Sequence, residues 1–344
     1  MGLPISQTLA PAGELVGAHD FTTDDLRAFH RDLVLARRID TEAFALQRHG
    51  ELGLWPPMLG QEAAQIGSGR ALAPDDFVFP SYREHAVAWC HGLDPALLLA
   101  IFRGTSLGGW DPTDHHIALP AIIIGAQTLH AVGYGIGLTL EGKEDAVVAY
   151  FGDGATSQGD TNEAFAWAAS YHAPVVFFCQ NNQYAISVPL ERQTRVPIAQ
   201  RAAGFGFEGV RVDGNDVLAV HQVTTEALVK ARAGGGPTLI EAITYRMGAH
   251  TTSDDPSRYR DAHEADEWAE RDPLQRLRLL LERTDPEFAA FDAGVQAEAE
   301  ALGEHLREVC GRLPDPDLAE LFEHVYDQIP PELVAQREEV RSWS

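Results

Sequence analysis

Apolar side chains recur at helical spacing over the first third of the chain. Residues 22–50 follow this pattern, and residues 60–72 and 84–103 also read as helices. Thr22 stands at the start of the first segment and is a residue type that favours a helix N-cap. The preceding residues, 1–20, show no periodicity and contain two prolines. The pattern therefore predicts an extended arm at 1–20, followed by helices.

The middle of the chain has a different pattern. Two short runs, residues 146–151 and 174–179, are continuously apolar and rich in β-branched and aromatic side chains. Strands buried on both faces have this composition, which is typical of a parallel sheet covered by helices. An alanine-rich helical segment at 157–171 separates the two runs, and a third candidate strand at 238–245 follows a helical segment at 219–232. The pattern predicts an α/β fold around a central, mainly parallel sheet.

The last part of the chain, residues 272–344, again reads as helices. The chain contains no repeat or low-complexity tract that would mark a second unit. We therefore expect a single domain over residues 21–344, with helical extensions at both ends of the sheet-forming region.

Composition narrows the classes of partner. The chain has 26 basic and 51 acidic residues, a net charge of −25, and such a surface repels phosphate backbones, so no nucleic-acid partner is expected. No apolar run approaches the roughly 18 to 20 residues that span a bilayer. The cysteines are few and far apart, at Cys90, Cys179 and Cys310, which excludes a disulfide framework. Without a visible leader pattern, the expected location is the cytoplasm.

Polar residues follow directly after two of the predicted strands. The first strand ends in Gly-Asp-Gly-Ala at 152–155, and the second leads into Asn181 and Asn182. Because the carboxyl ends of parallel strands meet at one edge of a sheet, we expect Asp153 and Asn182 to be neighbours there. A carboxylate and an amide oxygen suit Mg²⁺, which completes its octahedron with phosphate oxygens and water. The pattern predicts a magnesium–diphosphate site.

Simpler interpretations of the Gly-Asp-Gly string stay open at this point. On its own the string is also typical of a turn. A dinucleotide-binding loop would need a third glycine where Ser157 stands, and a phosphate-binding loop of the Walker type would need Gly-Lys-Ser/Thr. Thr156 or Ser157 is expected to cap the next helix, whose N-terminal amides favour an anion.

Several segments together resemble one family. Gly-Asp-Gly followed after a spacer by Asn-Asn is similar to the thiamine-diphosphate-binding motif. The longer string GDGATSQGD … NNQYAIS resembles the alpha subunit of the decarboxylating first component of 2-oxo acid dehydrogenase complexes. The resemblance covers about residues 22–335 and includes the segments 59–63 (LGQEA), 82–85 (YREH), 122–127 (IIIGAQ), 236–241 (GPTLIE) and 245–259 (YRMGAHTTSDDPSRY).

The resemblance implies a set of site residues and a thiamine-diphosphate-binding fold. Magnesium would be held by Asp153, the side chain of Asn182 and the backbone carbonyl of Tyr184. His250 would act at the active site as a catalytic residue. The cofactor would be bound by a wider set, namely Tyr82, Arg83, Ile122, Ile124, Gly152, Asp153, Gly154, Ala155, Asn182 and His250.

Some of these positions have a plainer interpretation. Tyr82 and Arg83 alone would be typical of a surface pair, although a guanidinium suits bidentate binding of phosphate. The spacing of 122–124 is also typical of ordinary core, and Ile123 is expected to be buried there. Position 180 is glutamine where some family members carry a cation, so no diphosphate role is expected for it. Thr251 stands where animal members carry a regulatory serine.

The resemblance also implies an activity. It points to oxidative decarboxylation of a 2-oxo acid and acyl transfer to a lipoyl-bearing acyltransferase. Pyruvate is the first expectation and branched-chain 2-oxo acids are the alternative. The family supplies the glutamate that activates the aminopyrimidine from a beta subunit, so we expect an α₂β₂ heterotetramer and an inactive isolated chain. A magnesium-dependent phosphohydrolase and a non-catalytic subunit of the same complex are the remaining alternatives.

Overall fold

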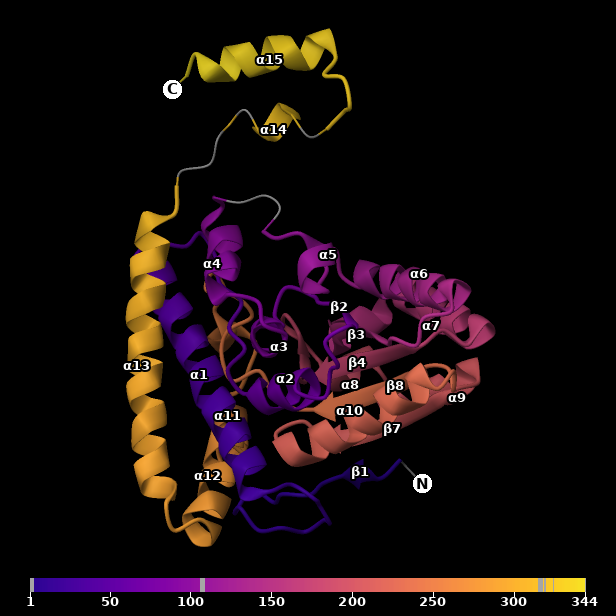
Figure 1. The fold of residues 1–344 in the computed structure, drawn as a ribbon, viewed down its shortest axis with the longest axis vertical. Coiled ribbons are helices and arrows are strands. Elements are labelled where there is room, and N and C mark those ends of the chain that lie inside the picture. Colours follow the sequence, from indigo (N-terminus) through magenta and orange to yellow (C-terminus); the bar gives the residue numbers. More distant parts are fainter. Residues whose placement is uncertain (1–2, 106–108, 315–317, 319, 324, 344) are drawn as a thin grey trace.

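The centre of the molecule is a parallel sheet (Figure 1). The computed structural model describes residues 3–105, 109–314, 318, 320–323 and 325–343. Within these residues the main sheet has six strands in the order β1-β7-β8-β4-β3-β2, and every neighbouring pair is parallel. The strands are β1 (Ile5–Ser6), β2 (Phe77–Phe79), β3 (Val147–Gly152), β4 (Val175–Asn181), β7 (Glu208–Asp213) and β8 (Thr238–Ile243). The predicted α/β fold is confirmed.

Both faces of the sheet are covered, which explains the continuous apolar runs. Alternate residues of β3 enter two different cores: Val148 and Tyr150 join one, whereas Val147 and Phe151 join the other. Helices α2, α3 and α10 cover the first face, and α6 and α7 cover the second. Their bounds are α2 (Glu62–Gly69), α3 (His85–Cys90), α6 (Ala126–Glu141), α7 (Gly159–Tyr171) and α10 (Val217–Arg232).

Three long helices form an outer layer beside the sheet. They are α1 (Thr23–Arg48), α12 (Pro273–Thr284) and α13 (Phe288–Arg312), and Figure 1 shows α1 and α13 side by side. Thr22 caps α1 as predicted, since its side chain accepts a hydrogen bond from Asp25 N. The buried His30 Nε2 lies 2.8 Å from Asp292 Oδ1 and joins α1 to α13. The N-terminal arm contributes β1, which pairs with β7.

Two local predictions are wrong. The helix expected at 84–103 divides into α3 and α4 (Pro95–Arg103), because Gly92 has a positive φ of 88° and Asp94 caps a new helix. Neither Thr156 nor Ser157 caps α7. A 3-10 turn over Asp153–Ser157 precedes that helix, and Gln158 occupies its N-cap without a side-chain hydrogen bond.

The C-terminal helices stand apart from the rest of the molecule. In Figure 1, α14 (Glu320–Glu323) and α15 (Pro331–Arg341) lie beyond the end of α13 and near each other. The described residues in and around these two helices expose several apolar side chains, including Leu321, Val325, Tyr326 and Trp343. The remaining short elements are β5 (Tyr184–Ala185), β6 (Val188–Pro189), α5 (Pro112–His115), α8 (Leu190–Gln193), α9 (Ala202–Phe205) and α11 (Ala262–Ala269).

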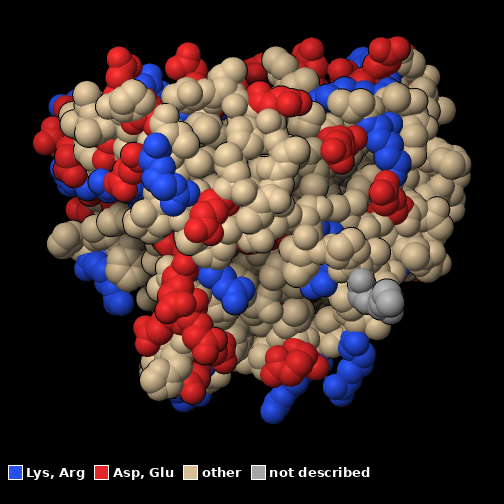
Figure 2. Space-filling view, turned by 90° about the horizontal axis from the view of Figure 1, so that it is seen from below, with Lys and Arg blue, Asp and Glu red and all other residues tan. Residues whose placement is uncertain are grey.

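The surface reflects the acidic composition. Figure 2 shows acidic side chains in several groups on one face, with arginine and lysine scattered among them. Among the helices that the structure describes, none has the length and apolar character needed to cross a bilayer.

Candidate functional site

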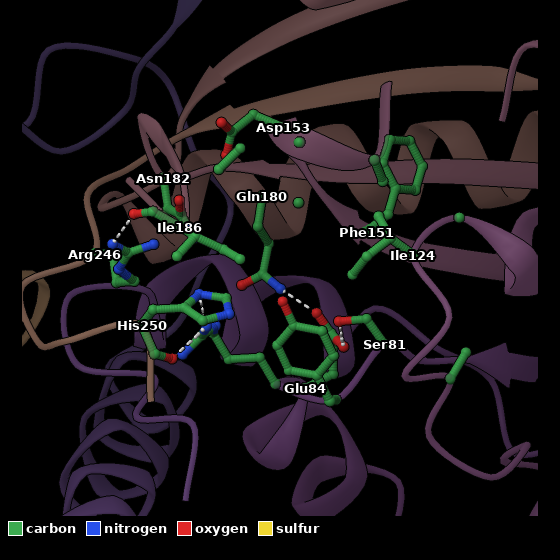
Figure 3. Close-up of a pocket in the computed structure, with 18 of the residues that line it drawn as sticks. Ser81, Glu84, Ile124, Phe151, Asp153, Gln180, Asn182, Ile186, Arg246 and His250 are labelled. Carbon is green, nitrogen blue, oxygen red and sulfur yellow. Dashed lines mark hydrogen bonds between the residues drawn. The ribbon is translucent and has the colours of Figure 1, made fainter. Parts of the chain in front are cut away.

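The carboxyl ends of β3 and β4 open into a cavity of about 370 Å³, a volume in the range of small-ligand pockets. All eleven residues proposed for cofactor or metal binding line this cavity: Tyr82, Arg83, Ile122, Ile124, Gly152, Asp153, Gly154, Ala155, Asn182, Tyr184 and His250. Figure 3 shows Asp153 and Asn182 on one side, Arg246 and His250 on a second, and Ile124 and Phe151 on a third. The structure therefore brings together segments that are up to 168 residues apart in sequence (250 − 82).

Strand register places the two polar strand ends together. Gly152 pairs with Gln180 across β3 and β4, so the residues that follow each strand leave the sheet side by side. Gly154 lies against the β5–β6 hairpin, where an added Cβ would come within 2.8 Å of Ala185 Cβ. A larger residue at this position would push the hairpin away from Asp153.

Three oxygen atoms converge beside these strand ends. The side-chain oxygen of Asn182 lies 3.2 Å from Asp153 Oδ1 and 3.1 Å from the carbonyl oxygen of Tyr184. Such edges match the roughly 3.0 Å between adjacent ligands of an octahedron with metal–oxygen distances of about 2.1 Å. With the amide turned over, its nitrogen would instead donate to both oxygens. Tyr184 N favours the first orientation, because this backbone N–H can only donate and it lies 3.3 Å from Asn182 Oδ1.

Asp153 is a buried carboxylate with a neutral partner. It is 1% exposed, and Gln193 Nε2 donates to its Oδ2 at 2.6 Å. Burial raises the pKa of Asp153 to about 6. A divalent cation at the oxygen cluster would compensate this buried charge, so the donor set and its electrostatics both fit magnesium.

Positive charge gathers on the facing wall. Arg83 is 4% exposed and Arg246 is fully buried. Arg83 donates to the carbonyls of Pro57 and His250, and Arg246 Nη2 donates to the carbonyl of Ile186 at 2.7 Å. In the part of the chain that the structure describes, neither guanidinium forms an ion pair with a carboxylate. Two buried guanidinium groups without counter-charges would be stabilised by an anion at this wall.

Arg246 was missed by sequence reasoning, which used its segment only for the resemblance. Its Nε is buried without a hydrogen-bond partner. Burial lowers the pKa of the Arg246 guanidinium, and the neighbouring Arg83 lowers it further. The position of Arg246, three residues beyond the end of β8, is the one signal that could have indicated it.

His250 is neutral in this environment. Burial, Arg83 and Arg246 together lower the pKa of its imidazole to about 4. Its Nδ1 lies 3.4 Å from Arg83 Nη2, which can only donate. Nδ1 is therefore the acceptor nitrogen, and Nε2 carries the proton. The imidazolium favoured by a nearby diphosphate would arise only when such an anion offsets the two arginines.

A polar network below the cavity engages Gln180. Gln180 Nε2 donates to Glu84 Oε1 at 2.6 Å, and Ser81 Oγ donates to Glu84 Oε2 at 2.7 Å (Figure 3). Burial raises the pKa of Glu84. Gln65 Nε2 donates to Gln180 Oε1 at 3.2 Å and to the Arg83 carbonyl at 3.0 Å. The network fixes the turn that carries Tyr82 and Arg83, which sequence reasoning did not foresee.

The apolar wall is more open than predicted. Ile122 is 66% exposed and Ile124 is 40% exposed, although both line the cavity. The prediction that Ile123 is buried in the core is wrong, because its side chain is 76% exposed. The segment is a loop before α6 rather than a strand or helix of the interior, so its central side chain points to solvent.

Comparison with known proteins decides the family. The family model described as dehydrogenase E1 component matches residues 30–300. This chain belongs to that family. The resemblance drawn from its motifs is therefore confirmed.

Two kinds of alpha subunit are similar to this chain. It is 45% identical to the 3-methyl-2-oxobutanoate dehydrogenase subunit alpha of Mycobacterium tuberculosis, over 99% of this chain and 96% of the relative. It is 39% identical to the pyruvate dehydrogenase E1 component subunit alpha of Bacillus subtilis, over 96% and 91%, and of Staphylococcus aureus, over 93% and 87%. The branched-chain alternative is thus better supported than pyruvate, the first expectation.

Proposed function

We propose that this chain is the alpha subunit of a branched-chain 2-oxo acid dehydrogenase and that it binds thiamine diphosphate through magnesium. The observation that carries the proposal is the convergence of three oxygens, on Asp153, Asn182 and Tyr184, opposite two unpaired buried arginines. One half of such a site suits a divalent cation and the other an anion, which together suit a metal-bound diphosphate. Pyruvate remains the second candidate substrate, because relatives of both kinds are similar to this chain.

Each wall of the cavity has a role in this proposal. Asp153, Asn182 and the Tyr184 carbonyl would hold magnesium. The diphosphate would be bound by Tyr82, Arg83, His250 and the backbone of Gly154 and Ala155, with Arg246 as an additional positive charge. Ile122 and Ile124 would lie against the rings. The bound cofactor supplies an electron sink for decarboxylation, whereas the protein positions and polarises it.

His250 would act through its proton-bearing Nε2. Before the cofactor binds, the neutral imidazole can donate a hydrogen bond from Nε2 while Nδ1 accepts from Arg83. The backbone of His250 is itself fixed, because its N–H donates to Asp254 Oδ2 at 2.9 Å and its carbonyl accepts from Arg83 at 2.9 Å. A group held in this way is oriented to hold or move a proton at the mouth of the cavity.

A partner chain would complete the site. Ile122, Ile123 and Ile186 expose apolar surface around the mouth of the cavity, and the C-terminal helices expose more. Clustered apolar side chains at the edge of a pocket are typical of a protein interface. We propose that a beta subunit covers them in an α₂β₂ heterotetramer in the cytoplasm, and that the complex passes its acyl group to a lipoyl-bearing acyltransferase.

The decisive experiment uses the reconstituted αβ pair. Decarboxylation of 3-methyl-2-oxobutanoate and of pyruvate is measured with an artificial electron acceptor, with magnesium and thiamine diphosphate present. We expect the pair to turn over 3-methyl-2-oxobutanoate readily and pyruvate weakly at most. The value of kcat/KM should be at least about tenfold higher for the branched substrate, which corresponds to about 1.4 kcal/mol. A preference for pyruvate would overturn the substrate assignment. Failure of the pair to bind thiamine diphosphate would overturn the function.

A further inference from the structure

A buried carboxylate of α1 lies outside the cavity and has unusual partners. Asp40 is 4% exposed. Its Oδ1 accepts hydrogen bonds from Trp55 Nε1 at 2.8 Å and Met58 N at 3.0 Å, and its Oδ2 accepts one from Leu59 N at 3.1 Å. Within the described residues, Asp40 forms no ion pair. All three donors belong to one short segment of the chain.

The segment that supplies these donors, residues 55–61, lacks backbone N–H groups at two consecutive positions. Pro56 and Pro57 lack an N–H group, so Met58 and Leu59 offer the first backbone donors after Trp55. Asp40 takes both of these, together with the indole N–H. A carboxylate suits this place because it accepts at both oxygens, whereas an asparagine would present its own N–H₂ to one of the donors.

The 55–61 segment contacts both charged walls of the cavity. The carbonyl of Pro57 accepts a hydrogen bond of 2.5 Å from Arg83 Nη1. Gln61 Oε1 accepts one of 3.1 Å from Asn182 Nδ2, and this contact holds the Asn182 side chain beside Asp153. One segment therefore orients an arginine of the anion wall and an amide of the oxygen cluster.

The same segment also holds the loop of His250. Trp55 N donates to Thr252 Oγ1 at 3.1 Å, and Thr252 N donates to the Trp55 carbonyl at 2.9 Å. Thr252 lies two residues after His250. The Trp55 ring in addition stacks on His85 with centroids 4.0 Å apart. Hydrogen bonds of the segment therefore reach Arg83, Asn182 and the loop that follows His250.

We infer that Asp40 is a positioning residue for the cofactor site, which sets Arg83, Asn182 and the His250 loop in place through the 55–61 segment. The inference rests on the proposed binding of magnesium and thiamine diphosphate. Residues that orient a binding group from behind commonly change affinity by about 10- to 100-fold when they are altered. A purely structural role would change stability alone.

The chain offers a matched control for that distinction. Asp76 is also fully buried, and it accepts hydrogen bonds from Ala73 N at 2.8 Å and Ala146 N at 3.0 Å. It pairs with Arg232 and does not line the cavity. Asp76→Asn therefore removes a buried carboxylate of similar hydrogen bonding without touching the 55–61 segment.

The experiment compares Asp40→Asn and Asp76→Asn in the reconstituted αβ pair. Calorimetry gives the Kd for thiamine diphosphate and for thiamine monophosphate with magnesium, and a thermal melt gives Tm. For Asp40→Asn we expect a Kd for the diphosphate raised about 10- to 100-fold. We also expect a smaller preference for the diphosphate over the monophosphate, because Arg83 no longer points correctly. Asp76→Asn is expected to lower Tm and leave both Kd values unchanged.

Trp55→Phe provides a second test if Asp40→Asn does not fold. It removes one of the three donors and keeps an aromatic ring against His85, so we expect the same changes at a smaller size, about threefold to tenfold in Kd. If neither Asp40→Asn nor Trp55→Phe alters Kd or the diphosphate preference, the inference is wrong. If the unaltered pair fails to bind thiamine diphosphate at all, the proposed function is wrong instead.

Discussion

The side-chain oxygen of Asn182 lies 3.2 Å from Asp153 Oδ1, although the two residues leave the ends of different strands. Two acceptor oxygens at this distance repel unless a proton or a cation lies between them. Gln61 holds the side chain of Asn182 in this place. A divalent cation between the two oxygens would relieve this repulsion.

Replacing Asp153 by asparagine is expected to stabilise the protein in the absence of magnesium. Burial raises the pKa of Asp153 from 3.8 to about 6, so the folded state holds this proton more tightly than the unfolded state. The contribution of that bound proton to the free energy of unfolding is complete below about pH 4, and it is lost as the pH rises through 6. At pH 7 the neutral amide of Asp153→Asn avoids a buried charge, and Tm should rise by on the order of 2 °C.

The same variant should lose magnesium-dependent binding of thiamine diphosphate. Asp153 is the one charged member of the oxygen cluster, so we expect the Kd of the αβ pair to rise by at least about 100-fold in a calorimetric titration. Asp160→Asn, which alters an exposed acid in the first turn of α7, serves as the control and should change nothing. Unaltered affinity in Asp153→Asn would remove Asp153 from the metal site.

Gly154→Ala is expected to weaken cofactor binding through a steric clash. The new Cβ would lie 2.8 Å from Ala185 Cβ and would displace the hairpin that carries the Tyr184 carbonyl. We expect a Kd about tenfold higher for magnesium and thiamine diphosphate. The double variant Gly154→Ala/Ala185→Gly should recover most of this loss, because it removes the opposing methyl group. Gly159→Ala, where nothing lies within 4 Å, is the control. Failure of the double variant to recover affinity would contradict this explanation.

Binding of the diphosphate should be accompanied by proton uptake at His250. Burial, Arg83 and Arg246 keep the pKa of the free imidazole near 4, and an anion between these groups raises it. Between pH 5 and 7 we therefore expect up to about one proton to be taken up for each cofactor bound. Calorimetry in two buffers of different ionisation enthalpy measures the uptake, and His250→Asn should abolish it. Equal uptake by both proteins would assign the proton elsewhere.

Ile123→Asp is expected to weaken assembly without unfolding the chain. Ile123 is 76% exposed, so the substitution leaves the melting temperature of the isolated chain unchanged. Burying an isoleucine against a partner contributes about 1.5 to 3 kcal/mol, which corresponds to about 10- to 100-fold in affinity for the beta subunit. Analytical ultracentrifugation measures the association. Val229→Asp, at an exposed position of α10, should assemble normally. Unimpaired assembly of Ile123→Asp would show that the mouth of the cavity is not the interface.

Sequence patterns predicted the centre of the fold better than its edges. Strands β3 and β4 are continuously apolar, and the sheet buries both of their faces, so their pattern is unambiguous. Strand β7 was missed because Glu208, Arg211 and Asp213 interrupt it and most of its residues are partly exposed. Helix α6 was missed because its glycines, at Gly133, Gly135 and Gly137, lower the helix propensity of the segment.

Some residues of the candidate site could likewise be predicted from the sequence, and others could not. Asp153 and Asn182 could be found because each directly follows a strand, and adjacent strand ends meet. Asp40 and Glu84 could not, because their roles depend on hydrogen bonds to segments whose position only the folded chain defines. Ile123 was misplaced because three consecutive isoleucines indicate hydrophobicity but not which way a loop turns them.

The pairing of β1 with β7 constrains the order in which the sheet can form. Ile5 pairs with Arg211, and the amides of Thr8 and Leu9 both donate to Asp216 Oδ2 at 2.6 Å. A ribosome releases the N-terminal arm long before it makes the strand and the aspartate that hold the arm in place. Closing so long a stretch of chain is slow. During synthesis, the outer edge of the sheet therefore stays open until residues beyond 216 have emerged, and the arm, although made before the strand it pairs with, is among the last segments to fold.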